Sequence, residues 1–137
     1  MTEQLHVLIA GAGIGGLALA HGLRRAGIRV SVFEQDGSID SRGQGYRINL
    51  RPVGDQALAA CLPPAVHDRV RATAYAFGRP KIAGFDSQLS ELFSRELSGE
   101  QLSVDRSVLR RVLLDEVHFG HTVAGVDEAA GRLVCPG

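Results

Sequence analysis

Two short apolar runs, separated by a glycine-rich segment with helical periodicity, organise the first quarter of the chain. The first run, Leu5–Ala10, is short and bounded by glycine, as is typical of a buried strand. Apolar residues then recur at helical spacing from Ile14 to about Arg25, and Gly27 stands where a helix cap is expected. The second run covers Ile28–Phe33. Two strands joined by one helix over so short a distance must be parallel, so the pattern predicts an α/β fold.

The turn after the first run carries Gly11, Gly13 and Gly16 in the spacing G-x-G-x-x-G. In Rossmann-like folds the first glycine allows a tight turn, the second lets a pyrophosphate approach the backbone, and the third lets helix and strand pack closely. Free N–H groups at the helix start, including that of Ile14, would face the phosphates. Glu34 lies eighteen residues beyond Gly16, where a carboxylate can accept hydrogen bonds from ribose hydroxyls.

These features predict a site for the adenosine half of FAD or NAD. The acid disfavours a ligand with a 2′-phosphate, because two negative groups would repel each other. A glycine-rich turn in another kind of strand–helix unit is the alternative, but it does not explain the position of Glu34.

A polar segment follows the second apolar run. We expect residues 35–51 to form a loop beside the ribose-binding end of the second strand. Arg42 in this loop could reach the diphosphate or the adenosine, and an ordinary solvated arginine is an equally good interpretation. Pro52 is well placed in the first turn of a helix, and Pro63-Pro64 would end that helix.

Short, partly alternating apolar segments mark residues 66–104. They predict a small antiparallel sheet inserted into the α/β unit, on the substrate side. Most of the aromatic residues lie here, which suits one wall of an apolar pocket, although a solvent-facing sheet would show the same pattern. Residues 117–135 predict a short strand followed by a hairpin.

A second informative helix begins near Arg106. Asp105 or Ser107 can cap it, and the apolar residues that follow have helical periodicity. A cation at a helix start opposes the helix dipole, so stability does not explain Arg106, whereas contact with an anion or a ring would. Arg110 and Arg111 lie nearer the C-terminal end and need no such explanation.

Size and charge narrow the functional classes. The chain has 137 residues, enough for one domain with a core, and its fifteen basic and fifteen acidic residues cancel. No basic field favours nucleic acid or a membrane surface. The apolar stretch near the start contains two histidines and several glycines and lacks a basic leader, so we expect a cytoplasmic protein.

Neither histidine nor cysteine spacing indicates a metal site. His118 and His121 form H-x-x-H without ligands at metal spacing, and Cys61 and Cys135 stand far apart, as expected of reduced, ordinary residues.

The whole chain resembles the N-terminal FAD-binding part of FAD-dependent monooxygenases of the aromatic-hydroxylase type, similar to para-hydroxybenzoate hydroxylase. Three segments carry the resemblance: Gly11-Ala-Gly-Ile-Gly-Gly16 with Glu34, Arg42-Gly-Gln-Gly45 leading to a helix at Pro52, and Val104-Asp-Arg106 before a Leu/Arg-rich helix. The first is common to many flavoproteins, and the other two are more specific.

The resemblance implies a role for each matched residue. Gly11, Gly13 and Gly16 would cradle the FAD pyrophosphate, and Glu34 would hold the adenosine ribose. Arg42 and Arg106 would contact the flavin cofactor. In such enzymes NADH or NADPH reduces the flavin, and O₂ adds to it as a C4a-hydroperoxide that hydroxylates a small, typically aromatic substrate.

The family is more than twice as long as this chain. It has an Asp-Gly motif beyond the position of Gly137, a later Gly-Asp motif and a larger substrate domain. The resemblance therefore implies an incomplete catalytic cleft, an exposed apolar edge at Leu5–Ala10 that could pair with a second copy, and weak or absent FAD retention. A truncated, non-catalytic nucleotide-binding or interaction module and an NAD-dependent dehydrogenase domain are the alternatives, and no catalytic acid or base can be named.

Overall fold

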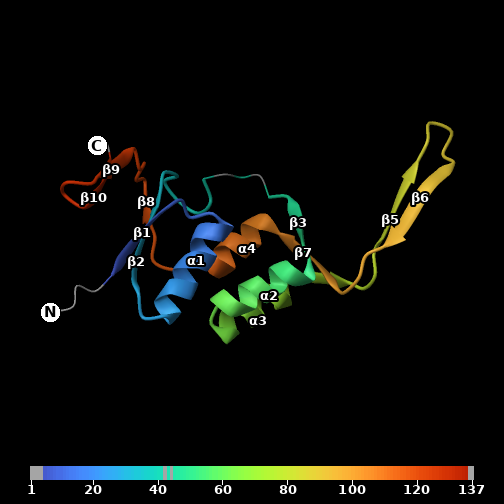
Figure 1. Cartoon of the computed structure of the whole chain (residues 1–137), viewed down its shortest axis with the longest axis horizontal. Helices are drawn as coiled ribbons and strands as arrows, with labels where there is room; N and C mark the ends of the chain where they lie inside the picture. The colour runs from blue at the N-terminus through green and yellow to red at the C-terminus, as the bar shows by residue number, and fades with distance from the viewer. Residues whose placement is uncertain (1–4, 42, 44, 136–137) are drawn as a thin grey trace.

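The computed structural model describes residues 5–41, 43 and 45–135. Helices and strands alternate in its first part, and short strands dominate its last part (Figure 1). The elements are β1 (His6–Ala10), α1 (Ile14–Arg25), β2 (Arg29–Glu34), β3 (Arg47–Leu50), α2 (Pro52–Cys61), α3 (Pro64–Thr73), β4 (Tyr75–Phe77), β5 (Lys81–Phe85), β6 (Glu91–Glu96), β7 (Gln101–Asp105), α4 (Arg106–Leu113), β8 (His118–Phe119), β9 (Gly125–Asp127) and β10 (Arg132–Val134).

The predicted β-α-β unit is confirmed. Strands β1 and β2 are parallel, with Ile9 opposite Val32, and β8 continues the sheet beside β2 in the order β1-β2-β8. Gly27 has a φ of +75° and ends α1, as its position in the sequence predicted. Among the described strands β1 pairs with β2 alone, so it forms an edge of this sheet.

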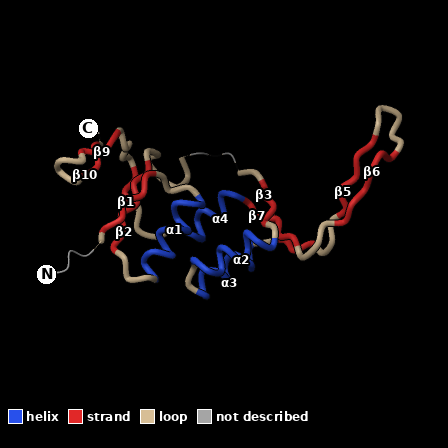
Figure 2. The backbone as a smooth tube through the Cα atoms, in the orientation of Figure 1, coloured by secondary structure: helices blue, strands red, loops and turns tan. Residues whose placement is uncertain are grey.

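Two sheets enclose the helices. Figure 2 shows the helices between the parallel sheet and a second, antiparallel sheet of order β3-β7-β4. Their apolar faces meet in a continuous core in which the largest buried side chains are Leu17, Val32, Leu62, Val70, Val104, Leu109 and Leu113. His21 is also buried, and its Nε2 lies 3.0 Å from the Leu113 carbonyl oxygen, so it is a packed histidine.

Two predictions of secondary structure are wrong in part, one for residues from 66 onward and one for the loop 35–51. Residues 64–73 form helix α3, where the sequence suggested antiparallel strands from residue 66. Pro64 begins this helix, and Val66 and Val70 pack against the core one helical turn apart. The predicted loop contains strand β3, in which Ile48 and Leu50 face the core and the intervening residues do not.

The remainder of the antiparallel prediction is confirmed, in two separate pieces. Strand β4 joins the second sheet, whereas β5 and β6, among the strands described, pair only with each other and extend away from the helices (Figure 1). The C-terminal hairpin of β9 and β10 is also as predicted. Cys61 and Cys135 are free cysteines. Within the described residues no helix combines the length and apolar character needed to cross a membrane.

Candidate functional site

The glycine turn has the geometry that its motif predicts. Gly11 has a φ of +104°, a region that side chains disfavour, and its N–H donates to the Phe33 carbonyl oxygen at 2.7 Å. A Cβ at Gly16 would lie 2.1 Å from the Gly11 carbonyl oxygen, so only glycine lets α1 come this close to the turn. Local sequence thus fixes how the helix leaves the strand.

The first turn of α1 presents free hydrogen-bond donors. Gly13 is the N-cap residue, no side chain caps the helix, and its first turn contains no acid. The first backbone bond back to the cap comes from Leu17 N–H, so the amides of Ile14 and Gly15 have no acceptor among the described residues. A Cβ at Gly13 would meet nothing within 4 Å. Open space beside Gly13 therefore lies next to free N–H donors, an arrangement that fits a diphosphate.

Glu34 ends β2 with its carboxylate directed at this turn. The side chain is 7% exposed. Its Oε2 accepts a hydrogen bond from Ala12 N–H at 2.9 Å, and its Oε1 accepts one from Asp36 N–H at 3.0 Å. A carboxylate oxygen can accept more than one hydrogen bond, so these contacts leave acceptor capacity for hydroxyl groups of a ligand.

Arg110 belongs to the site, although the sequence analysis assigned it no role. Its side chain is buried, its Nε donates to the Ala12 carbonyl oxygen at 3.1 Å, and its Nη2 lies 3.8 Å from Glu34 Oε2. Arg106 lies four residues earlier on the same helix. That spacing places both arginines on one face of α4, and it is the signal that could have identified Arg110.

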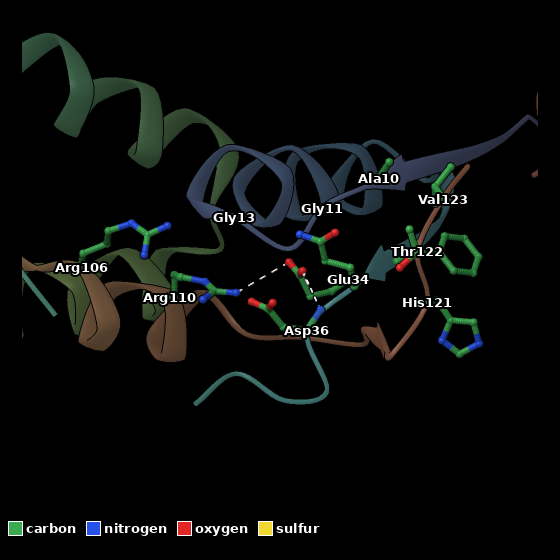
Figure 3. Close-up of a pocket in the computed structure, with 12 residues that line it drawn as sticks. Ala10, Gly11, Gly13, Glu34, Asp36, Arg106, Arg110, His121, Thr122 and Val123 are labelled. Carbon is green, nitrogen blue, oxygen red and sulfur yellow. Dashed lines mark hydrogen bonds and ion pairs between the residues drawn. The ribbon is translucent and has the colours of Figure 1, made fainter. Parts of the chain in front are cut away.

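One cavity of about 370 Å³ joins these groups (Figure 3). The turn and Glu34 line one part of it, Arg106 and Arg110 line a second part, and the segment after β8 lines a third. The lining residues are Ala10, Gly11, Gly13, Phe33, Glu34, Gln35, Asp36, Arg106, Arg110, His121, Thr122 and Val123. Arg42, the other predicted flavin contact, lies outside the described residues.

Arg106 occupies the first position of α4, as predicted. Asp105 caps the helix through Oδ1, which accepts from Ser107 N–H at 2.8 Å and Val108 N–H at 3.0 Å. The Arg106 guanidinium carbon lies 5.6 Å from the centre of the Tyr46 ring, and no acidic partner for it occurs among the described residues. A cation that faces a cavity without a paired carboxylate is available to an anionic ligand.

The segment after β8 closes the cavity beside Glu34. His121 N–H donates to the Glu34 carbonyl oxygen at 2.9 Å, and the rings of Phe33 and His118 stack with centroids 5.0 Å apart. Across the described residues, no group of histidine, cysteine and acidic side chains could hold a metal ion. No local pattern indicates that this segment reaches the site, because β8 is only two residues long.

Comparisons with known proteins converge on one class. A family model described as an NAD(P)-binding Rossmann-like domain matches residues 9–54. The chain is 37% identical, over 90% of its length, to the Dual O-methyltransferase/FAD-dependent monooxygenase CTB3 of Cercospora beticola. It is 33% identical, over 91% of its length, to the FAD-dependent monooxygenase phnB of Penicillium herquei.

A solved structure gives the same result. A crystal structure from Photorhabdus luminescens, ascribed to an FAD-containing monooxygenase, superposes with a TM-score of 0.73 over 96% of this chain at 29% identity. The chain matches the N-terminal FAD-binding part of FAD-dependent monooxygenases. The chain spans 16% of the length of CTB3, 32% of phnB and 37% of the Photorhabdus chain.

Proposed function

We propose that this chain is the FAD-binding portion of a flavin-dependent monooxygenase that uses NADH or NADPH and O₂ to hydroxylate a small aromatic substrate. The relatives support FAD as the cofactor. The observation that carries the proposal is that Gly11 and Gly13 of the glycine turn, the Glu34 carboxylate and Arg106 line a single cavity, next to the unpaired amides at the start of α1. When bound, FAD supplies the redox chemistry that connects a pyridine nucleotide with oxygen.

The amides at the start of α1 hold the diphosphate in this proposal. Ile14 and Gly15 donate their N–H groups along the helix axis, where the dipole adds favourable potential for negative charge. Gly13 offers no side chain, so phosphate oxygens can approach the backbone closely. Binding here needs no rearrangement of the turn, because Gly11 and Gly16 already fix it.

Glu34 and Arg106 place the two ends of the cofactor. The carboxylate accepts hydrogen bonds from the ribose hydroxyls of the adenosine half. Arg106, at the start of α4, contributes a positive charge and a flat guanidinium toward the flavin half. Arg42 is assigned the same flavin-side role from the family resemblance.

Substituting alanine at Gly13 tests this cradle. Its backbone angles, φ −75° and ψ 176°, suit any residue, and the added Cβ meets no protein atom. Gly13→Ala should therefore leave the melting temperature unchanged and weaken FAD binding by about tenfold or more, because the methyl group occupies the space of the diphosphate. Gly37→Ala, in a loop with equally open space, is the matched control.

A flavin fluorescence titration gives the dissociation constants. Calorimetry supplies the constant for NAD, and both titrations run to about millimolar ligand, because this portion alone is expected to hold FAD weakly. Wild type that binds NAD better than FAD would favour a dehydrogenase domain, and wild type that binds neither at these concentrations would leave only an interaction module. Gly13→Ala with wild-type affinity for FAD would contradict the cradle. Reduction of bound flavin by NADH or NADPH, followed by its absorbance, would support the enzymatic part of the proposal.

A further inference from the structure

Arg110 carries a buried charge, and the formation of helix α4 does not explain why this side chain is buried. The residue is 5% exposed, whereas the adjacent Arg111 lies at the surface and donates from its Nε to Asp40 Oδ1 at 2.9 Å. Removing a guanidinium from water costs several kcal/mol unless hydrogen bonds and an opposite charge compensate it. The compensating groups show what the residue does.

Arg110 has two partners, Ala12 in the glycine turn and the Glu34 carboxylate that faces this turn. The Arg110 Nε donates to the Ala12 carbonyl oxygen, and its Nη2 faces Glu34 Oε2. The same Oε2 accepts the N–H of Ala12. The N–H and the carbonyl of Ala12 are thus bonded to two different side chains, one from β2 and one from α4. Figure 3 shows these two side chains, Glu34 and Arg110, facing each other.

This arrangement fixes the two peptide groups on either side of Ala12. The Ala12 N–H points to Glu34, so the amides left for a ligand are those that follow it, from Gly13 to Gly15. Arg110 also offsets the charge of Glu34, which would otherwise repel a diphosphate at the same cavity. The guanidinium suits both tasks, because its donors diverge in a rigid fork.

We infer that Arg110 is a positioning residue, which holds the Ala12 peptide and the Glu34 carboxylate in the geometry that an adenosine diphosphate group needs. The inference rests on the proposed dinucleotide site and goes beyond it, because Arg110 acts through the turn and the acid. Its expected effect is therefore confined to ligands that contain adenosine diphosphate.

The test compares the full chain with three variants: Arg110→Met, Arg110→Lys and, as the matched control, Arg111→Met. Without ligand, hydrogen exchange at the Ala12 amide should accelerate about tenfold or more in Arg110→Met, because Glu34 loses the partner that orients it. Arg110→Lys should show a smaller acceleration, since one ammonium cannot reproduce both contacts. Arg111→Met should exchange like wild type.

Ligand titrations supply the second readout. Arg110→Met should weaken FAD and ADP binding by similar factors, about tenfold or more, and leave riboflavin binding unchanged. The double variant Arg110→Met/Glu34→Gln removes both charges, so it provides a folded background if the single variant fails to fold. The double variant should lower ADP affinity by a smaller factor than the product of the factors for Arg110→Met and Glu34→Gln measured alone.

Two results would overturn the inference. One is wild-type exchange at Ala12 in Arg110→Met, whatever happens to affinity, since a direct ligand contact would then be the better account. The other is a loss of ADP affinity in the double variant that equals the product of the two single losses, since the two residues would then act independently. If wild type binds neither FAD nor ADP at about millimolar ligand, the proposed function fails, and the exchange rate of the Ala12 amide still decides whether Arg110 holds the turn.

Discussion

The body of the molecule consists of the four helices and the two sheets that enclose them. The body and the β5–β6 hairpin both contain large apolar side chains, but only the body buries them. Leu17 and Leu109 are almost completely covered in the body, whereas Leu92 and Phe93 of the hairpin are 67% and 59% exposed. The body is held by packing between segments far apart in sequence, and the hairpin by backbone pairing between neighbours. The candidate site lies entirely on the body side, where packing can keep its geometry fixed.

Truncating one leucine in each region should give the largest difference. Leu109→Ala opens a cavity in the core and should lower the free energy of unfolding by about 2–5 kcal/mol. Leu92→Ala on the hairpin should change it by about 0.5 kcal/mol at most. Urea denaturation followed by circular dichroism measures both. Equal losses would mean that the hairpin is packed in solution.

Two glycines extend the comparison. A Cβ at Gly16 would meet backbone at 2.1 Å, whereas one at Gly84 would meet the Phe93 ring at 2.3 Å. The exposed ring can rotate away and the buried turn cannot, so Gly16→Ala should cost about 3 kcal/mol and Gly84→Ala about 1 kcal/mol or less. The same denaturation experiment decides the order, and a larger loss for Gly84→Ala would refute this explanation.

Self-association through β1 stays a prediction. Leu5, next to this unpaired edge, is exposed, and a lysine there should block pairing between copies. Sedimentation velocity over a range of concentrations should show Leu5→Lys less associated than wild type by about two- to threefold in apparent affinity. Leu92→Lys is the control on the hairpin. If it alone reduced association, the contact would lie there instead.

The smallest effect is expected at the hairpin tip. Asp86 Oδ1 accepts from Gln88 N–H at 2.8 Å and Ser90 N–H at 2.9 Å, and these backbone bonds lower the pKa of Asp86. A lowered pKa means that the carboxylate stabilises the tip above the unfolded pKa, and this contribution disappears as pH falls through the folded pKa.

Acid titration by NMR tests that sign. The amide resonances of Gln88 and Ser90 should move as the pH falls through a midpoint below the ordinary range of an aspartate. Asp86→Asn keeps an acceptor oxygen and should remove this titration. A midpoint above the ordinary range would contradict the assignment.

The sequence allowed the β-α-β unit to be predicted because its signals are local. Gly11, Gly16 and Gly27 each meet a backbone requirement within a few residues, and apolar spacing distinguishes strand from helix. The same locality explains why Arg106 could be singled out at the start of α4 and Asp105 named as a candidate cap.

The missed features depend on distant contacts. Arg110 reaches Ala12, ninety-eight residues away, and no local rule marks that pairing. Helix α3 was mistaken for strand because its polar residues conceal a helical spacing that becomes visible once Val66 and Val70 pack. Strand β3 falls within the predicted loop because its pairing with β7, across more than fifty residues, has no local signal.

The most direct test of the account is an NMR titration of the isotope-labelled chain with FAD, ADP and riboflavin in parallel. Chemical shifts can locate a site even when binding is weak. The account predicts that FAD and ADP shift the amide resonances of Gly13, Ile14 and Gly15 and that riboflavin leaves them in place. Shifts confined to other residues, or identical shifts with riboflavin, would contradict a diphosphate site at the start of α1.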